Sequence, residues 1–152
     1  MLYLDDLVVG ARYEAGPLPV EQDEVIAFAK RYDPQPFHTD PEAAKGTLFG
    51  GLAASGWMTA SLTMRMLVDS GTGPAGGFIA RKIEAMEWPV PVRPGDTLRA
   101  TSEVVEVLPS RSRPDRGMVR MRTETRNQKD EIVQVLTALL VVHRRPTEAA
   151  HA

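Results

Sequence analysis

The sequence contains no cysteine among its 152 residues and only three histidines, His38, His143 and His151. The lack of cysteine excludes disulfides, thiolate zinc sites, iron–sulfur ligation and cysteine nucleophiles together. It also suits a reducing compartment, so we expect a cytoplasmic protein. The shortage of histidine leaves few side chains that could carry acid–base chemistry near neutral pH.

A charge excess and long apolar runs are also lacking. The 18 basic and 20 acidic side chains give a net charge of −2, so no overall basic field points to nucleic acid or an anionic membrane. The longest apolar run, residues 136–142, has the length of a strand and falls short of the roughly 20 residues that span a bilayer. The apolar start is interrupted by Asp5 and Asp6, so no signal-peptide core forms.

The length fits one domain with a core of its own. We expect that domain to cover residues 1–146, followed by a short, polar, disordered tail at 147–152.

Two segments have helical patterns. Residues 25–32 carry apolar side chains at amphipathic-helix spacing, and Pro34 ends this helix before a loop that contains Pro36 and Pro41. A second helix is predicted from about Gly56 to Asp69, with Ser55 as its N-cap. Because it is apolar almost all round, we expect it to lie inside the protein, wrapped by other elements.

The second half of the chain reads as strands joined by turns. These strands are predicted at residues 79–92, where prolines interrupt the pattern, and at 97–108, 118–127 and 132–143. Long strands that follow the helices imply an α+β fold with an antiparallel sheet packed on helix 56–69.

The loop at residues 32–40 holds the most informative polar groups. Asp33 and His38 lie five residues apart with two prolines between them, and a stiff loop can direct both side chains toward one volume for general acid–base chemistry. The alternative is that His38 and Asp40 merely cap turns. A metal site made of Asp33, His38 and Asp40 is weaker, because no second imidazole lies nearby, and we expect no metal.

Glycines before the second helix form another candidate site. Gly50, Gly51 and Gly56 allow close approach of a ligand to the helix start, where unpaired N–H groups could act as an oxyanion hole for a thioester carbonyl. The alternative is a simple helix cap.

These segments resemble a known family. Residues 32–44 (YDPQPFHTDPEAA) are similar to the hydratase signature of MaoC-like acyl dehydratases, also called (R)-specific enoyl-CoA hydratases. Residues 54–57 (ASGW), 91–98 (PVRPGDTL) and 110–117 (SRSRPDRG) fit the same family. The resemblance implies a hotdog fold, in which a curved antiparallel sheet wraps a long central helix, and a homodimer.

The resemblance also implies roles for particular residues. Asp33 and His38 match the catalytic pair that holds the water added across the 2,3-double bond of an enoyl thioester. The N–H of Gly56 matches the donor that polarises the thioester carbonyl, and the implied substrate-binding side chains are Gln35, Phe37, Ser55 and Trp57. The sequence departs from the pattern at Gln35, where Asn is usual, at Ser55, where His is common, and at Met64, where some members have Ser.

A local basic cluster consists of Arg111, Arg113 and Arg116. It is either a solvated hairpin tip or a contact for the phosphates of coenzyme A or the acidic face of a carrier protein.

The leading hypothesis is a hydro-lyase that converts a trans-2-enoyl thioester, on CoA or acyl carrier protein, reversibly to a 3-hydroxyacyl thioester, in the R configuration implied by the resemblance. No cofactor is expected beyond the CoA of the substrate. A hotdog thioesterase is the alternative, although such enzymes place a carboxylate on or beside the central helix and this helix has none before Asp69. A non-catalytic thioester-binding subunit is the third possibility.

Overall fold

A curved antiparallel sheet dominates the fold. The structure is a computed structural model that describes residues 1–147. Within that range the sheet has five strands in the order β1-β3-β4-β5-β2, and neighbouring strands are antiparallel. The strands are β1 (Arg12–Pro19), β2 (Ile79–Glu87), β3 (Thr97–Pro109), β4 (Arg116–Arg126) and β5 (Ile132–His143).

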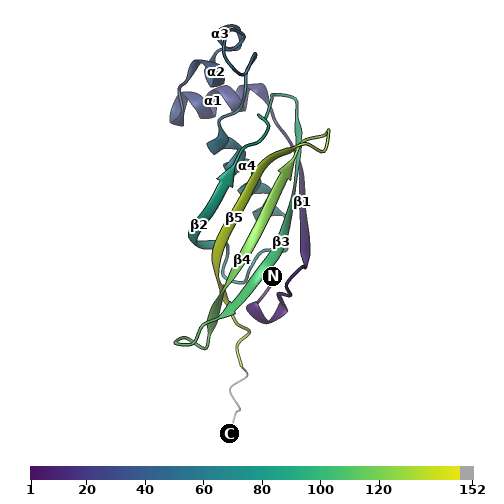
Figure 1. The fold of residues 1–152 in the computed structure, drawn as a ribbon, viewed down its shortest axis with the longest axis vertical. Helices are drawn as coiled ribbons and strands as arrows, with labels where there is room; N and C mark the ends of the chain where they lie inside the picture. Colours follow the sequence, from purple (N-terminus) through teal and green to yellow (C-terminus); the bar gives the residue numbers. More distant parts are fainter. Residues whose placement is uncertain (148–152) are drawn as a thin grey trace.

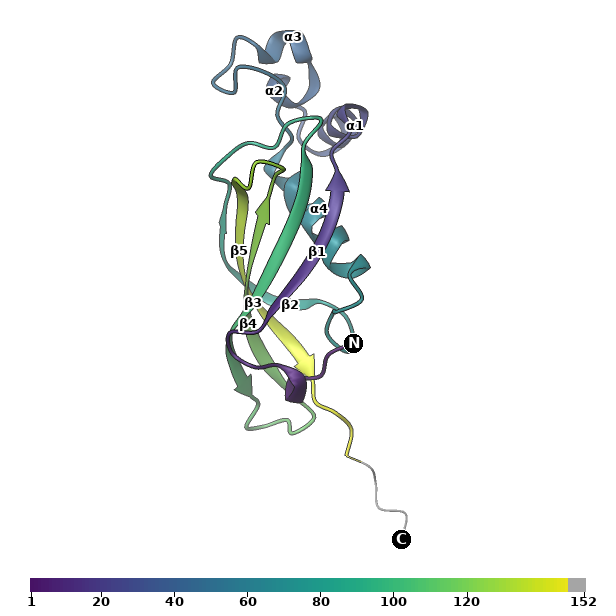
Figure 2. The ribbon, with the colours of Figure 1, turned by 90° about the vertical axis from the view of Figure 1, so that its right-hand side faces the viewer.

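The long helix α4 (Gly56–Asp69) lies across one face of this sheet, and the sheet curves around it (Figures 1 and 2). Three further helices, α1 (Gln22–Tyr32), α2 (Pro36–Thr39) and α3 (Pro41–Ala44), gather at the end of the sheet beside the start of α4. A 3₁₀ turn, η1 (Leu4–Asp6), packs on β4. The α+β hotdog architecture predicted from the sequence is confirmed.

The structure corrects the expected loop after α1. Pro36 and Pro41 each occupy a first helical position, in α2 and α3. Proline is well suited there because its missing N–H would have no intrahelical partner. The prolines therefore begin two short helical turns, and α2 carries His38 inward.

Two strands also differ from the sequence prediction. Strand β1 was not predicted, because its Gly16-Pro17 and Pro19 break the apolar alternation. It is an edge strand whose register shifts between Ala15 and Leu18, and proline is tolerated at edges and bulges. Strand β2 ends at Glu87 rather than at residue 92, since Pro89 and Pro91 have no N–H for a further ladder.

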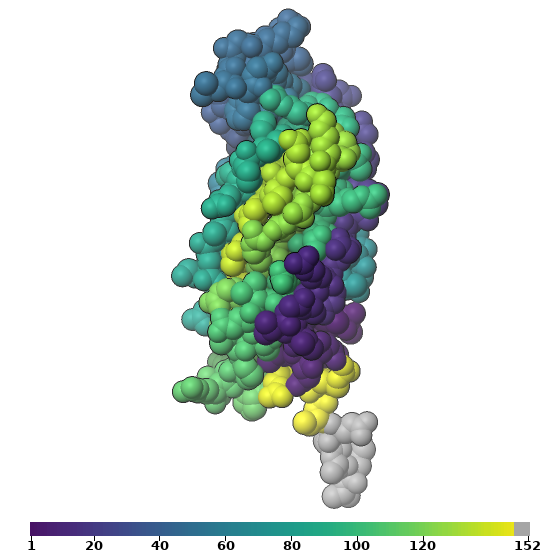
Figure 3. Space-filling view, turned by 45° about the vertical axis from the view of Figure 1, so that its right-hand side comes forward, coloured from purple at the N-terminus to yellow at the C-terminus, as the bar shows by residue number. Residues whose placement is uncertain are grey.

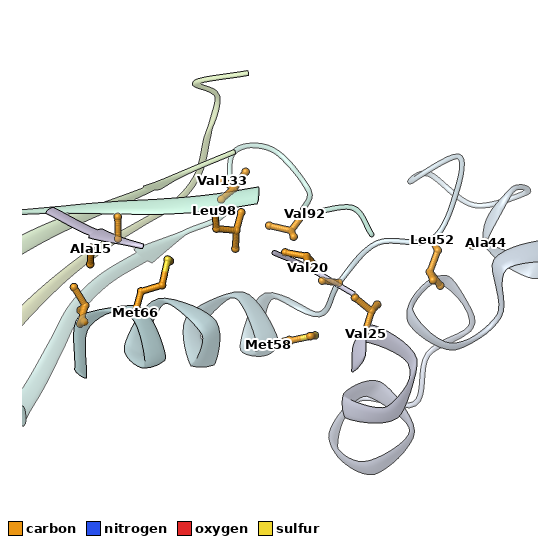
Figure 4. Packing of buried hydrophobic residues seen from close by; sticks show 13 residues of the cluster. Ala15, Val20, Val25, Ala44, Leu52, Met58, Met66, Val92, Leu98 and Val133 are labelled. Carbon is orange, nitrogen blue, oxygen red and sulfur yellow. The ribbon is translucent and has the colours of Figure 1, made fainter. Parts of the chain in front are cut away.

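The core lies between the inner face of α4 and the sheet. Met66 projects from α4 toward Leu98 on the sheet, whereas Met58 points toward Val25 on α1 (Figure 4). On β4, Val119, Thr123 and Thr125 are buried and alternate with less buried side chains.

The other face of α4 is not enclosed. Trp57, Met64 and Val68 are 61%, 40% and 58% exposed, so the sheet wraps α4 as predicted on one face but leaves the opposite face open. Among residues 1–147, no helix is long and apolar enough to cross a membrane. Apart from Thr147, the predicted disordered tail lies outside the described residues.

Leucine truncation tests how the core contributes to stability. Leu98 is completely buried against α4, and replacing such a leucine with alanine typically costs about 2–5 kcal/mol through lost burial and a residual cavity. We expect Leu98→Ala to lower the free energy of unfolding in urea by that amount. Leu48→Ala is the matched control, because Leu48 is fully exposed; an equal loss in both variants would contradict this description of the core.

Candidate active site

Asp33 and His38 meet at the end of the sheet where α1, α2 and α4 come together. Asp33 is the C-cap of α1, and His38 lies in the single turn of α2. The Nε2 atom of His38 is 3.3 Å from Oδ2 of Asp33, with side-chain exposures of 6% and 18%. The structure thus brings the predicted acid–base residues into one small, largely buried volume.

The orientation of His38 is fixed by a backbone carbonyl. Nδ1 of His38 lies 2.7 Å from the carbonyl oxygen of Ala53, and because a carbonyl can only accept, Nδ1 carries the hydrogen. In the neutral imidazole, Nε2 is then an acceptor that faces the Asp33 carboxylate. Two acceptors at this distance suit a water or a hydroxyl group that donates a hydrogen bond to either of them.

The packing around the imidazole comes from two aromatic rings. Phe37 meets the His38 ring edge-on with centroids 4.5 Å apart, and Phe49 lies 5.0 Å from Phe37. Phe37 also packs against the hydrophobic core. Phe37 therefore packs between the imidazole and the hydrophobic core. Its predicted contact with substrate stays a prediction.

The Asp33 carboxylate accepts two side-chain hydrogen bonds. Gln35 donates to Oδ1 at 2.6 Å and Ser55 donates to Oδ2 at 2.7 Å. Burial opposes ionisation of Asp33, but the hydrogen bonds from Gln35 and Ser55, together with the neighbouring His38, lower its pKa below the ordinary 3.8. Ionised Asp33 therefore stabilises the fold at pH values above 3.8, and this contribution is lost as the pH falls through the lowered pKa.

Ser55 joins this carboxylate to the start of α4. Its hydroxyl oxygen accepts from the Trp57 N–H at 3.3 Å while its hydrogen goes to Asp33, which confirms the predicted N-cap. Gly56 is the first residue of α4, so its N–H has no intrahelical acceptor and lies at the positive end of the helix dipole. The arrangement places an unsatisfied donor next to an acid–base pair.

Trp88 explains why residue 56 is glycine. A Cβ atom at Gly56 would lie 2.7–2.9 Å from three atoms of the Trp88 ring, so any side chain would displace the indole. Trp88 is held from behind by the hydrogen bond from its Nε1 to Oε1 of the buried Gln134, at 3.0 Å. Trp57 meets Trp88 edge-on at 5.5 Å and is itself mostly exposed at the outer rim of the site.

Arg93 organises the segment that precedes α4, and sequence reasoning missed this role. Its guanidinium donates to the carbonyls of Phe49, Gly51 and Leu52 at 2.5–3.2 Å. Its own N–H donates to the Asp96 carboxylate at 2.8 Å. The motif at residues 91–98 was visible in the sequence, but its contact with a segment about forty residues earlier was not.

Other predicted candidates lie elsewhere. The Asp40 carboxylate accepts from the N–H groups of Glu42 and Ala43 as the N-cap of α3, so the turn-capping alternative is correct for Asp40. Within residues 1–147, no three His, Asp or Glu side chains gather in a metal-binding arrangement.

The arginines at 111, 113 and 116 belong to the β3–β4 hairpin, at the opposite end of the molecule from α1–α3 (Figure 3). Strand β3 alone has 13 residues, which at about 3.3 Å each separate the two ends by roughly 40 Å. These arginines therefore lie far from Asp33 and His38 of the same chain, and their predicted contact with the phosphates of coenzyme A or with a carrier protein stays a prediction.

A family comparison agrees with this geometry. Residues 7–130 match the model of the MaoC-like domain. The chain belongs to the MaoC-like domain family. The match covers the acid–base loop, the start of α4 and most of the sheet, so the motifs that carried the resemblance lie inside it.

Similar proteins include members with described activities. The chain is 51% identical to a MaoC-like dehydratase from Rhodospirillum rubrum, whose crystal structure superposes with a TM-score of 0.93 over 97% of this chain and 100% of that one. It is 32% identical to a 3-hydroxybutyryl-CoA dehydratase from Methylorubrum extorquens over 74% of this chain and 70% of the relative. The R-hydratase PhaJ1 from Pseudomonas aeruginosa is 26% identical, with a TM-score of 0.75 over 99% and 92% of the two chains. The MaoC-like family thus includes hydratases and dehydratases.

Removal of the Ser55 hydroxyl tests its double role. We expect Ser55→Ala to lose about 1 kcal/mol of stability with the helix cap and to raise the pKa of Asp33, because one donor to the carboxylate is gone. Urea unfolding and a ¹³C NMR titration of the Asp33 carboxyl measure the two effects. Ser61→Ala is the control, since the Ser61 hydroxyl bonds only within the exposed face of α4. An unchanged Asp33 pKa in Ser55→Ala would contradict the assignment.

Proposed function

We propose that this MaoC-like chain is a hydro-lyase that adds water reversibly to a trans-2-enoyl thioester and forms an (R)-3-hydroxyacyl thioester. The observation that carries the proposal is the approach of His38 Nε2 and Asp33 Oδ2, at 3.3 Å, beside the start of α4. An acid–base pair and an anion-stabilising donor are the two parts that addition to a conjugated thioester requires.

The start of α4 supplies the electrophilic part. As water attacks C3, the electrons of the double bond move toward the thioester and negative charge grows on its oxygen. A fixed donor such as the Gly56 N–H stabilises that charge more in the transition state than in the substrate. The Trp88 ring packed on Gly56 limits the approach of water to this donor from one side.

His38 is the better base of the pair. Asp33 is already engaged by Gln35 and Ser55 and has a lowered pKa, which makes it a weak proton acceptor. His38 Nε2 is an acceptor because Nδ1 donates to Ala53. We assign His38 to remove a proton from water as the C3–O bond forms; the resulting imidazolium, stabilised by Asp33, returns that proton to C2. One O–H bond of water and the C2–C3 π bond are broken, and one C3–O and one C2–H bond are made, so the atoms and electrons balance.

The name of one relative supports a short acyl thioester. One relative is named for 3-hydroxybutyryl-CoA and another structure is an R-hydratase, so the proposed substrate is an enoyl group on CoA, with acyl carrier protein as the alternative carrier.

Substitution of the acid–base pair tests the function. We expect Asp33→Asn and His38→Ala to lower kcat by about 10²–10⁴-fold with the fold retained by circular dichroism. The assay follows loss of the conjugated thioester absorbance of crotonyl-CoA, with released thiol measured in parallel. Asp23→Asn and His143→Ala are matched controls, because Asp23 lies in the first turn of α1 and His143 ends β5.

The outcomes separate the alternatives. Wild-type loss of conjugation without thiol supports the hydratase, whereas release of thiol identifies a thioesterase. Neither reaction across a panel of chain lengths identifies a binding subunit, and full activity in both pair variants removes Asp33 and His38 from the mechanism.

We also propose that the working unit is a homodimer formed through β2 and α4. Strand β2 is a sheet edge that carries exposed Ile79 and Ile83. Ile83 lies opposite the core residue Ala138 and therefore projects toward the α4 side of the sheet. The exposed Met64 and Val68 continue this apolar surface along α4. A second copy covers both the open backbone edge and the apolar helix face.

A charge placed on α4 tests the dimer. We expect wild-type protein to show twice the chain mass of 16.7 kDa in light scattering after gel filtration. Val68→Asp buries a charge in the interface and is expected to give monomers. Val105→Asp is the control, because Val105 is a similarly exposed valine on β3. A wild-type monomer, or an unchanged dimer in Val68→Asp, would count against this interface.

A further inference from the structure

A basic groove lies at the end of the sheet that is remote from Asp33 and His38. It has a volume of about 510 Å³ and is open to solvent. Both apolar side chains and arginines line it, the principal residues being Leu108, Met118, Val141, Arg81, Arg113 and Arg116. The combination suits a ligand that has both a flat apolar ring and phosphate groups, since guanidinium groups stack on rings and bind phosphates in two-point contacts.

The charge in this groove is only partly neutralised. Arg116 pairs with Asp115 at 2.8 Å, whereas among residues 1–147 no carboxylate lies within ion-pair distance of Arg81 or Arg113. Both of these arginines are exposed. On a chain of net charge −2, this local excess of positive charge has no partner in its own subunit.

The groove cannot serve its own subunit's site, because the length of the sheet lies between them (Figures 1 and 3). The proposed dimer changes that relation. A two-fold axis that pairs two β2 strands antiparallel reverses one subunit relative to the other. The beginning of one β2, which carries Arg81, then lies level with the end of the other β2, next to Trp88 and the start of α4.

We infer that the groove completes the active site in trans: the partner subunit's Arg81, the partner subunit's Arg113 and the partner subunit's Arg116 bind the phosphate groups of the coenzyme A whose acyl end lies between Asp33, His38 and Gly56. This inference rests on the proposed function and dimer. It explains why the acid–base pair and the arginines sit at opposite ends of one chain. It also commits the enzyme to CoA thioesters.

The first test separates phosphate binding from catalysis. The double variant Arg113→Ala/Arg116→Ala is expected to raise KM for crotonyl-CoA roughly ten- to a hundredfold at low salt, as the loss of charged hydrogen bonds predicts. Its kcat should be close to that of the wild type. For crotonyl-pantetheine, which lacks the nucleotide phosphates, KM should equal that of the wild type. Arg12→Ala/Arg99→Ala removes the same charge from exposed positions on β1 and β3 and should leave both substrates unaffected.

The second test shows which subunit supplies the arginines. Two differently tagged chains are co-expressed, one with Asp33→Asn and the other with Arg113→Ala/Arg116→Ala, and the mixed dimer is purified through both tags. The mixed dimer contains one intact Asp33, and the intact arginines are on the other chain. Binding in trans predicts wild-type KM with about half the wild-type kcat, because one of two sites is active. A KM as high as in the arginine variant would show binding within one subunit and overturn the inference.

Direct binding keeps this test independent of the proposed reaction. Calorimetric titration with CoA should show weaker binding to Arg113→Ala/Arg116→Ala than to the wild type, even if no thioester is turned over. Equal affinities would overturn the groove's role whether or not the hydratase assignment holds. A raised KM for a crotonyl-carrier protein with an unchanged KM for crotonyl-CoA would also overturn it, and would assign the groove to the carrier protein.

Discussion

The geometry of the site depends on the extended segment between Gly51 and Ser55. Its backbone is fixed on both sides: the Ala53 N–H donates to the Phe37 carbonyl at 3.0 Å, and the Ala54 N–H donates to the Val92 carbonyl at 2.8 Å. The Arg93 guanidinium holds the start of the segment through backbone carbonyls. Because the segment is fixed in this way, the Ala53 carbonyl can set the imidazole tautomer and the hydroxyl of Ser55 can hold the Asp33 carboxylate.

This constraint links two parts of the site that come from different elements. The acid–base side chains belong to the short turns after α1, while the anion-stabilising donor belongs to α4. Short helical turns have few hydrogen bonds of their own and would otherwise be free to move relative to a long helix. Ser55 bonds to both, as N-cap of α4 and as donor to Asp33. A single hydroxyl therefore links Asp33 of the acid–base pair to the helix start that carries the Gly56 N–H.

The sequence predicted the parts of the molecule that are encoded locally. The bounds of α4, its Ser55 cap and the three long strands β3, β4 and β5 follow from periodicity and turn residues, and the Asp33–His38 spacing follows from a proline-rich loop. Strand β1 was missed because its prolines break the apolar alternation, although pairing with β3 makes it a strand. The Ala53 carbonyl, Trp88 and Arg93 were missed because their roles arise from contacts 15 to 44 residues apart along the chain, which no local pattern records.

The strand order determines where the exposed face of α4, the edge strand β2 and the basic groove lie relative to one another. In a sheet of order β1-β3-β4-β5-β2, the central helix runs antiparallel to β2, so the start of α4 lies beside the end of β2. The β3–β4 hairpin lies at the opposite end of the sheet, because β3 begins near the site and runs away from it. Trp57 remains 61% exposed at the rim of the site, where an indole needs a covering surface to contribute its apolar area. A reversed copy brings to this rim the end of the fold that carries the exposed Arg81 and Arg113. In the proposed dimer, the exposed face of α4, the β2 edge and the basic groove all contribute to one assembly. Each subunit then supplies the acid–base pair at one of its ends and the phosphate-binding arginines at the other.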